Sequence, residues 1–365
     1  MFLIVTRNFP PDIGGIQSLM EGLSESLLNH GPVKVFAYEY GNSNIYDKKS
    51  RVNIERVKGI KLFRKYRKAN LVNSFIASNP NIRALIVDHW KSVELVKTEN
   101  LKKIKTFCLL HSKEINHDIG SSLNRRIIKS TNSVDFIIAN SNFTKNLAIK
   151  IGIDKSKIQV IFPGIQKPKN IENINNVKAE KYFSDSFPKI ITVARMDKRK
   201  GHDKILMLIK NLKPKFPKIK YISIGHGEEE KNILKLSKVL KIEKEVTFLK
   251  NIDYDLKTAL ISESDLFLMP SRIEKKSVEG FGIVFIEAAS YGVASIGGKD
   301  GGAPDAINHG KTGLICDGNN LDSIYDSVVN FFENENFIKY GKNAKEFSEK
   351  FHWDKVVKNY LKLIN

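Results

Sequence analysis

The sequence predicts an α/β protein built from two doubly wound, parallel-sheet domains. A chain of 365 residues is too long to pack around one ordinary core. Short apolar runs alternate with amphipathic segments of helical length, which is the pattern of strands and crossover helices in a parallel sheet. The pattern stops at Pro163-Gly164 and restarts after a polar stretch. We therefore expect one domain in residues 1–166, a linker in residues 167–187 and a second domain in residues 188–348.

Six apolar runs in the first half have the length and composition of buried strands. The segment 1–6 is too short for the apolar core of a signal peptide and is predicted to hold the first strand. Amphipathic segments such as 17–29 and 144–151 are predicted to be helices that cover the sheet. The predicted strands are Phe2–Val5, Val33–Tyr38, Ala84–Val87, Thr106–Leu110, Phe136–Ala139 and Ile158–Phe162.

The second half repeats this alternation. Helical patterns at 203–212 and 230–241 separate apolar runs, and residues 349–365 form a final amphipathic helix. The apolar side of that helix is predicted to hold Trp353, Val356, Val357, Tyr360, Leu361 and Ile364. The predicted strands of the second sheet are Lys189–Ala194, Lys220–Ile224, Val246–Leu249, Leu266–Met269, Ala294–Ile296 and Leu314–Cys316.

Composition and charge limit the class of partner. The chain is 41% hydrophobic and 27% charged, as in globular proteins, and its net charge is +20. Residues 1–166 hold 26 Lys+Arg against 13 Asp+Glu, which indicates an anionic partner: nucleic acid, anionic lipid or a polyanionic substrate. No apolar run reaches the roughly 18 residues of a membrane span. Cys108 and Cys316 lie in apolar contexts without metal-ligand spacing, so we expect both to be buried thiols in a reducing compartment.

The most informative stretch is residues 277–292, which hold Glu279 and Glu287 eight positions apart. An apolar strand ends before it at Pro270, and a helix is predicted at Ile283–Ser290 after a glycine-rich turn. Such a turn leaves backbone N–H groups and the positive end of the helix free to bind an anion. Carboxylates are good acceptors for hydroxyl groups. The stretch therefore predicts a ligand that has both phosphates and sugar hydroxyls.

A second charged motif opens the second domain. The first strand there delivers Arg195, and Lys200 follows five residues later, before a glycine. A guanidinium fork and an ammonium suit a departing diphosphate, whose negative charge grows during the reaction. The alternative is a basic turn on a lysine-rich surface. Lys198 and Arg199 are predicted to be solvated neighbours.

These two motifs, together with the pattern from Gly297 to Gly318, resemble the E-x7-E signature of retaining glycosyltransferases of family 4. The amino-acid sequence within these motifs is most similar to that of bacterial phosphatidylinositol mannosyltransferases. The resemblance implies the GT-B fold: two Rossmann-like domains that face a cleft, with a C-terminal helix that crosses back to the first. It also implies transfer of a hexose from a nucleotide diphosphate sugar with retention. GDP-mannose is the favoured donor, and a UDP-hexose remains open.

The resemblance also assigns site residues. Arg195 and Lys200 match a G-R-x4-K-G element, with Ala194 in place of the first glycine. His111 opens an H-G-x-E element, with Ser112 in the glycine place, and would face the transferred sugar. Glu279 would hold sugar hydroxyls and Glu287 the ribose. The candidate catalytic residues are therefore Arg195, Lys200, His111 and Glu279, and the candidate donor-binding residues are Gly14, Gly15, Gly225, Lys250, Phe281, Gly282, Ile283 and Glu287.

Simpler interpretations exist for some of these positions. Gly14-Gly15 could be an ordinary strand–helix loop, although adjacent glycines before a helix allow a ligand to approach the backbone closely. Gly225 could mark only a tight turn. Asp253-Tyr254-Asp255 spells the D-x-D of metal-dependent transferases, but its place before a helix at 256–262 favours N-capping. We expect no metal and no cofactor other than the nucleotide sugar as co-substrate.

The acceptor side is less defined. Gln17 follows the glycine pair, and residues 56–76 combine cations with apolar residues in the manner of an interfacial membrane segment. The alternative is a basic surface helix whose apolar residues face the core. The resemblance implies a lipid-linked or glycan acceptor, and we expect a cytoplasmic protein that could lie on the inner face of the plasma membrane. The candidate acceptor and membrane residues are Gln17, Lys61, Arg64, Lys65, Arg67 and Lys68.

Two other functions fit parts of the sequence. One is a UDP-sugar-dependent transferase of lipopolysaccharide or capsule synthesis. The other is a non-catalytic nucleic-acid-binding protein, which the net charge alone suggests. Against that second function, the basic residues are spread over many elements and no RNA-binding module pattern is present. We therefore expect no nucleic acid among the partners.

Overall fold

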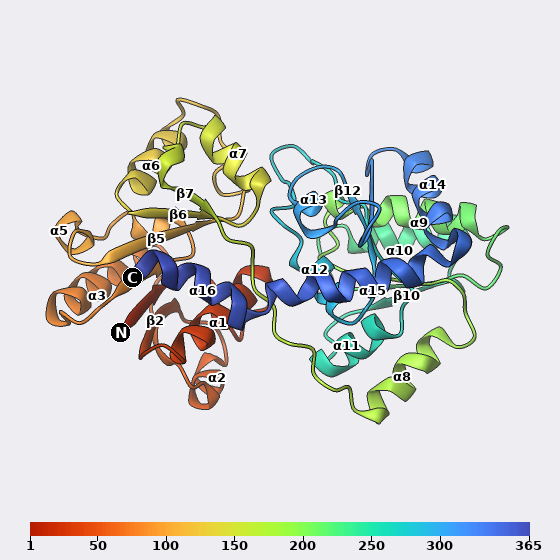
Figure 1. Cartoon of the computed structure of the whole chain (residues 1–365), viewed down its shortest axis with the longest axis horizontal. Coiled ribbons are helices and arrows are strands. Elements are labelled where there is room, and N and C mark those ends of the chain that lie inside the picture. The colour runs from red at the N-terminus through yellow and green to blue at the C-terminus, as the bar shows by residue number, and fades with distance from the viewer. The chain divides into compact units, whose positions relative to one another are not determined.

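A computed structural model describes the backbone of residues 1–365 and every side chain except that of Asn334. The chain forms two compact units (Figure 1). The first consists of Met1–Gln166 together with Phe351–Asn365, and the second of Lys167–Lys350. The end of the chain therefore belongs to the unit with which the chain begins.

The first unit contains a seven-stranded sheet in the order β3-β2-β1-β4-β5-β6-β7, and all its strand pairs are parallel. The strand order reverses between β1 and β4, so the carboxyl ends of these two strands form the switch point of the sheet. The strands are β1 Phe2–Val5, β2 Val33–Tyr38, β3 Asn53–Val57, β4 Ala84–Val87, β5 Lys105–Leu110, β6 Phe136–Ala139 and β7 Ile158–Val160. All six predicted strands are present, and β3 was missed.

Helices cover both faces of this sheet. Successive side chains of a strand point to opposite faces, so each strand contributes apolar residues to two separate cores. Phe2 and Ile4 of β1 belong to one hydrophobic cluster, and Leu3 and Val5 belong to the other. The helices of this unit are α1 Gly15–Leu28, α2 Ser43–Lys49, α3 Arg64–Ser78, α4 Trp90–Val93, α5 Thr98–Leu101, α6 Ser122–Asn132, α7 Asn142–Lys150 and α16 Trp353–Ile364, with the 3-10 turn η1 at Lys155–Lys157.

The last helix, α16, lies beside α1 and completes the core of the first unit (Figure 1). Its residue Trp353 is buried against two glycines. A Cβ built on Gly22 would lie 2.0 Å from the indole Nε1, and one built on Gly164 would lie 2.4 Å from the ring. The backbone N of Trp353 also donates to the carbonyl of Ile165 at 3.1 Å. Small residues at these two positions therefore make room for the indole.

The second unit contains a six-stranded parallel sheet in the order β10-β9-β8-β11-β12-β13, with its switch point between β8 and β11. The strands are β8 Lys189–Val193, β9 Lys220–Ile224, β10 Val246–Leu249, β11 Leu266–Met269, β12 Ser295–Gly298 and β13 Gly313–Cys316. The helices are α8 Asn173–Phe183, α9 His202–Leu212, α10 Glu230–Val239, α11 Tyr254–Ser262, α12 Ile283–Ser290, α13 Ala303–Ala306, α14 Leu321–Phe332 and α15 Asn336–Ser348, with 3-10 turns η2 Lys198–Lys200 and η3 Glu333–Glu335. A further 3-10 turn, η4 Glu349–Phe351, spans the boundary between the two units.

The predicted linker 167–187 is wrong in part, because it contains helix α8, which packs on α11. Ala179 and Phe183 of this helix are buried, and they anchor an otherwise polar segment. In the part of the chain that the structure describes, no helix combines the length and the apolar character that a membrane span requires.

Candidate active site

The switch point of the second sheet brings together a cluster of three charged residues. The loop after β8 ends in the 3-10 turn η2, whose last residue, Lys200, is buried. The Lys200 ammonium contacts the Glu279 carboxylate and lies 3.6 Å from Met269 Sδ, at the end of β11. Two residues that lie 79 positions apart in the sequence thus form a buried ion pair beside the switch point.

Arg199 also belongs to this cluster, so the prediction that it is a solvated neighbour is wrong. Its guanidinium NH1 lies 2.8 Å from Glu279 Oε2, the same oxygen that Lys200 contacts, and its side chain is 18% exposed. The backbone N of Arg272, just past β11, donates to the Arg199 carbonyl at 2.9 Å and fixes the turn. Lys198, in contrast, is 57% exposed and pairs with Glu274 at 3.7 Å.

The two cations determine the ionisation of Glu279. Burial alone would raise the pKa of the Glu279 carboxyl, but the charges of Lys200 and Arg199 outweigh it and lower the pKa to about 2. Burial lowers the pKa of the Lys200 ammonium, and the Glu279 carboxylate opposes that shift. The cluster therefore places two basic side chains on one ionised carboxylate.

Three residues after Glu279, the chain turns into helix α12. Gly282 is the N-cap with φ +85°, a left-handed conformation that favours glycine, and a Cβ there would lie 2.6 Å from ring carbons of Phe285. Gly282 has no side chain with which to cap the helix. The N of Phe285 donates to the Gly282 carbonyl at 2.9 Å, and the two N–H groups before it can face a ligand. Phe281 is buried, and Ile283 is the first residue of the helix. The cations of the cluster and the positive end of α12 thus occupy one region.

Glu287 lies in the second turn of α12 and faces helix α11. Its Oε2 lies 3.6 Å from the Lys257 ammonium, and its side chain is 28% exposed. The Lys257 ammonium also lies 4.6 Å from the centre of the Tyr254 ring. Burial raises the pKa of Tyr254 to about 12, with the Tyr291 hydroxyl and the Glu287 carboxylate adding to the shift. Glu287 is therefore a partly accessible carboxylate bordered by polar side chains.

The predicted catalytic residue Arg195 and two predicted donor-binding residues, Lys250 and Gly225, lie outside the cluster. Arg195 is exposed, and its ion-pair partner is Asp197 at 2.8 Å. Lys250 is 60% exposed and pairs with Glu230 at 2.9 Å. Gly225 has φ +141°, and a Cβ there would lie 2.1 Å from the carbonyl oxygen of Ala194. The close packing of the loops after β8 and β9 is enough to explain why residue 225 is glycine, without a bound nucleotide.

In the first unit, His111 follows β5 in a tight turn. Its backbone N donates to Glu114 Oε1 at 2.5 Å, and its Nε2 lies 3.0 Å from the carbonyl oxygen of Asp88. The next residue, Ser112, has φ +87°, which explains why glycine suits this position in the H-G-x-E pattern. The Ser112 hydroxyl lies 2.5 Å from that of Thr144, so a buried contact holds the turn in place.

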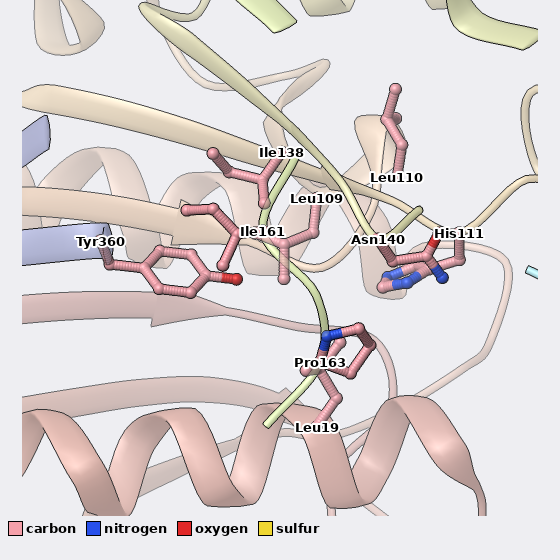
Figure 2. A pocket seen from close by; sticks show the side chains of 9 residues that line it. All are labelled: Leu19, Leu109, Leu110, His111, Ile138, Asn140, Ile161, Pro163 and Tyr360. Atoms are coloured by element: carbon pink, nitrogen blue, oxygen red, sulfur yellow. The ribbon is translucent and has the colours of Figure 1, made fainter. Parts of the chain in front are cut away.

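A cavity of about 10 Å³ lies behind this histidine (Figure 2). That volume has room for about one water molecule and none for a sugar. In Figure 2 the His111 ring and the Asn140 amide lie on one side of the cavity and the Tyr360 phenol, from α16, lies on the other. The cavity beside His111 is therefore too small to be a substrate pocket.

The glycine pair lies where the sequence predicts it, at the start of α1. Gly14 is the N-cap in an extended conformation, and a Cβ on Gly15 would meet no atom within 4 Å. Gln17, in the first turn, donates from Nε2 to Asp12 Oδ2 at 2.6 Å. The backbone at Gly15 is thus open to a ligand.

Helix α3 begins at Arg64, and the basic residues in and just before it differ in exposure. Lys61, Lys65 and Arg67 are exposed and Arg64 is half-buried. The assignment of Lys68 to a membrane surface is wrong, because its side chain is buried and its ammonium donates to the Thr6 carbonyl at 3.2 Å and the Ser92 hydroxyl at 3.0 Å. Helical periodicity could have revealed this, since Lys68 lies four and eight residues before the buried Val72 and Ile76.

Metal-ligand geometry is lacking within the described residues, where no group of three His, Cys, Asp or Glu side chains could hold an ion. Asp253 instead accepts a hydrogen bond from the backbone N of Leu256 at 2.6 Å. The prediction that it caps the following helix is confirmed.

Both halves of the chain are similar to known glycosyltransferases. Residues 173–350 match the family model of glycosyl transferases group 1, and residues 13–167 match that of glycosyltransferase family 4. A GDP-mannose-dependent alpha-(1-6)-phosphatidylinositol monomannoside mannosyltransferase from Mycolicibacterium smegmatis is 25% identical over 89% of this chain and 87% of its own. An N-acetyl-alpha-D-glucosaminyl L-malate synthase from Bacillus anthracis is 29% identical over 74% and 76% of the two chains.

Solved structures agree on the fold. A glycosyltransferase from Rickettsia africae has a TM-score of 0.80 at 20% identity, over 100% of this chain and 97% of its own. Anabaena HepE in complex with UDP has a TM-score of 0.81 at 17% identity, over 99% and 98% of the two chains. The two parallel sheets have the same strand order around their switch points, and each half of the chain matches a glycosyltransferase family model. The chain therefore belongs to the glycosyltransferases of the GT-B fold, with a family 4 first half and a group 1 second half.

Proposed function

We propose that the protein transfers a hexose, with retention, from a nucleotide diphosphate sugar that binds in the second unit. The favoured donor is GDP-mannose, because several relatives are named as GDP-mannose-dependent mannosyltransferases. A UDP-hexose is the second candidate, since Anabaena HepE of the same fold binds UDP and UDP-glucose.

The single observation that supports this proposal best is the cluster of Arg199, Lys200 and Glu279 beside the uncapped end of α12. Two cations and a helix N-terminus can stabilise the negative charge that grows on a departing diphosphate. Two cations contact the Oε2 atom of Glu279, and its other oxygen can accept hydrogen bonds from sugar hydroxyls. We assign the ribose to Glu287 and a hydroxyl of the transferred sugar to His111.

The proposed mechanism needs little covalent chemistry from the protein. The acceptor hydroxyl attacks the anomeric carbon on the face from which the diphosphate leaves, and a phosphate oxygen of the leaving group takes the hydroxyl proton. The C–O bond to the diphosphate breaks as the new glycosidic bond forms. Catalysis is then mainly electrostatic stabilisation of the leaving group. Neither Glu279 nor Glu287 acts as a nucleophile.

A donor panel tests this proposal. The protein is incubated separately with GDP-mannose, UDP-glucose, UDP-galactose and UDP-N-acetylglucosamine, and slow release of free nucleotide into water is measured. We expect release from one of these donors and little from the rest, with GDP-mannose as the first choice. Absence of release from every donor, together with binding of nucleic acid, would favour the binding-protein alternative.

The reaction is proposed to proceed without a metal ion. Lys200, Arg199 and the end of α12 supply the positive charge that a divalent cation supplies in metal-dependent transferases. Nucleotide release should therefore persist in excess EDTA. Complete loss with chelator, restored by Mg²⁺ or Mn²⁺, would show that the reaction requires a metal.

The acceptor is proposed to bind to the first unit and to be lipid-linked. Ile60, Leu62, Phe63 and Tyr66 are 50–73% exposed, and Lys58, Lys61, Lys65 and Arg67 lie among them. We refer to these eight residues as the apolar–basic patch. Such a surface suits the interface of an anionic membrane, where each cation adds on the order of 1 kcal/mol. The protein would then be cytoplasmic and lie peripherally on the inner face of the plasma membrane.

Co-sedimentation with vesicles tests the membrane proposal. Wild type should sediment with phosphatidylglycerol vesicles at low salt, and replacement of Lys58, Lys61, Lys65 and Arg67 by Gln should abolish this. The matched control replaces Lys48, Lys49, Lys102 and Lys103, four exposed lysines outside the apolar–basic patch, and removes the same charge. Equal sedimentation of the two variants would show that net charge, and not this surface, binds the membrane.

A further inference from the structure

A lysine and an aspartate of opposite charge are buried in the first unit, and the mechanism proposed above uses neither of them. Lys68 extends from α3, Asp88 follows β4, and both side chains are buried. Burying charged groups is costly even when they compensate one another, and well-packed apolar residues often stabilise a core at least as well. The presence of this pair therefore calls for an explanation other than stability.

The carboxylate of Asp88 is held on both of its oxygens. Its Oδ1 accepts from the Ser92 hydroxyl at 2.8 Å, and its Oδ2 accepts from the backbone N of Arg7 at 2.9 Å and lies 2.9 Å from the Thr6 hydroxyl. The Lys68 ammonium donates to the same Ser92 hydroxyl at 3.0 Å and to the Thr6 carbonyl at 3.2 Å. The network thus ties residue 88 to the chain that follows β1, to α3 and to α4.

The two charges depend on one another. Burial would raise the pKa of the Asp88 carboxyl, but the charge of Lys68 and the hydrogen bonds from the Arg7 N and the Ser92 hydroxyl together lower it below its usual range. Burial lowers the pKa of the Lys68 ammonium to about 8, and the charge of Asp88 opposes that shift. Removal of either partner would leave a buried charge without compensation.

The backbone of Asp88 leads directly to His111. The Asp88 N donates to the Val5 carbonyl at 3.3 Å, and the Asp88 carbonyl oxygen lies 3.0 Å from His111 Nε2. Because a carbonyl oxygen only accepts, Nε2 carries the proton, and Nδ1 is the acceptor of the neutral ring. The backbone N of His111 is held by Glu114 Oε1 at 2.5 Å, so His111 is fixed at its backbone and at its ring.

We propose that Asp88, with its partners Lys68 and Ser92, is a positioning residue for His111. The carboxylate fixes the peptide that follows residue 88, and the carbonyl of that peptide fixes the orientation and the tautomer of the His111 ring. An apolar side chain at position 88 would fill the same space but could not hold this carbonyl in place. The proposal rests on the proposed function in assigning a hydroxyl of the transferred sugar to His111, which would accept from that hydroxyl through Nδ1.

Nitrogen NMR of the free protein, labelled with ¹⁵N-histidine, tests the tautomer directly. The His111 signals are identified by their absence in His111→Gln. We expect wild type to carry the proton on Nε2, and Asp88→Asn to shift both ring nitrogens toward a mixture of tautomers. A proton on Nδ1 in wild type, or unchanged signals in Asp88→Asn, would overturn the proposal. This measurement needs no donor, so the positioning role and the proposed reaction can fail independently.

A double-mutant cycle tests whether Asp88 acts through His111. Nucleotide release from the preferred donor is measured for Asp88→Asn, His111→Gln and the double variant. We expect Asp88→Asn to slow release roughly tenfold in the wild-type background, as for the loss of one well-placed hydrogen bond, and to have little further effect once His111 is replaced. The same slowing in both backgrounds would show that Asp88 acts independently of His111 and would contradict the proposal.

A matched control separates positioning from a general loss of stability. Asp135 also accepts from a backbone N and a hydroxyl, both of Thr106 at 2.8 Å, but at the amino end of β5, whereas His111 follows its carboxyl end. Asp135→Asn should lower the unfolding temperature and leave nucleotide release and the His111 signals unchanged.

Ser92→Ala keeps the test informative if Asp88→Asn does not fold. It removes only the hydroxyl that joins Lys68 to Asp88. We expect it to slow nucleotide release and to shift the His111 signals in the same direction as Asp88→Asn. If Ser92→Ala behaves like Asp135→Asn and lowers only the unfolding temperature, the network is merely structural and the proposal is wrong.

Discussion

At the scale of single residues, Glu279 joins two basic side chains through one carboxylate. Its carboxylate holds the side chains of Arg199 and Lys200 in place before any donor is bound. Cations fixed in this way need little reorganisation when negative charge develops on a leaving group, which is the condition for effective electrostatic catalysis. Removal of Glu279 would leave two cations uncompensated, one of them buried, which is costly for stability.

The depressed pKa of Glu279 predicts a pH-dependent loss of stability. Its folded-state pKa is about 2, against an ordinary value of 4.5, so it stabilises the fold fully above pH 4.5 and loses this effect as the pH falls toward 2. By linkage the effect is on the order of 3 kcal/mol. Urea unfolding should show Glu279→Gln less stable than wild type at pH 7, and the difference should shrink toward pH 2. A difference that does not vary with pH would contradict the assigned pKa.

Gly15 offers a test of ligand approach that is independent of stability. A methyl group at this position would meet no protein atom within 4 Å, so Gly15→Ala should unfold at the same temperature as wild type or slightly above it. If a substrate lies against this backbone, the same methyl should lower turnover or raise KM. Full activity in a variant of normal stability would show that the glycine pair is only a strand–helix loop.

The sequence predicted Lys200, Glu279 and Glu287 as site residues, and the structure pairs Lys200 with Glu279, but the surroundings of Lys200 differ from the prediction. In the 3-10 turn η2 the chain folds so tightly that Arg199 and Lys200 both reach Glu279, and no pattern in the sequence indicates this. Arg195 and Lys200 are five positions apart, and that spacing alone cannot reveal that one is exposed and the other buried. Side-chain direction in an irregular loop depends on tertiary contacts, which spacing does not encode.

At the scale of elements, the sequence predicted the strands that are both apolar and buried. The central strands are continuous apolar runs because helices cover both faces of each sheet, and all of them were predicted. Strand β3 was missed because it is an edge strand of largely polar residues, whose Glu55 pairs with Lys34 and whose Arg56 pairs with Asp47. Helix α8 was missed because only a few of its residues are buried.

The contact between α1 and α16 depends on the absence of a side chain at Gly22. Although alanine is the better helix former, Gly22→Ala would place a methyl group 2.0 Å from the Trp353 indole. We expect a net loss of about 1–3 kcal/mol in the free energy of unfolding, as for other overpacked cores. Thermal denaturation would measure it, with Gly41→Ala as control because a methyl there meets nothing within 4 Å. Equal stability of the two variants would show that the indole can move aside.

At the scale of the whole molecule, the basic charge has an uneven distribution that suits an anionic acceptor. Of the net +20, residues 1–166 account for +13, and that segment contains the apolar–basic patch. The excess charge of this segment is the charge that the proposed membrane contact would use.

The central claim is that the cluster of Lys200, Arg199 and Glu279 stabilises a departing nucleotide diphosphate. The most direct measurement is the rate of nucleotide release from the preferred donor by wild type, Lys200→Gln and Lys198→Gln, with folding checked by circular dichroism. Lys198 is the matched control because it is adjacent, exposed and paired with Glu274. We expect Lys200→Gln to be slower by roughly tenfold or more, since a charge-assisted contact contributes about 1.5–3 kcal/mol, and Lys198→Gln to match wild type. Equal rates in the two folded variants would contradict the claim.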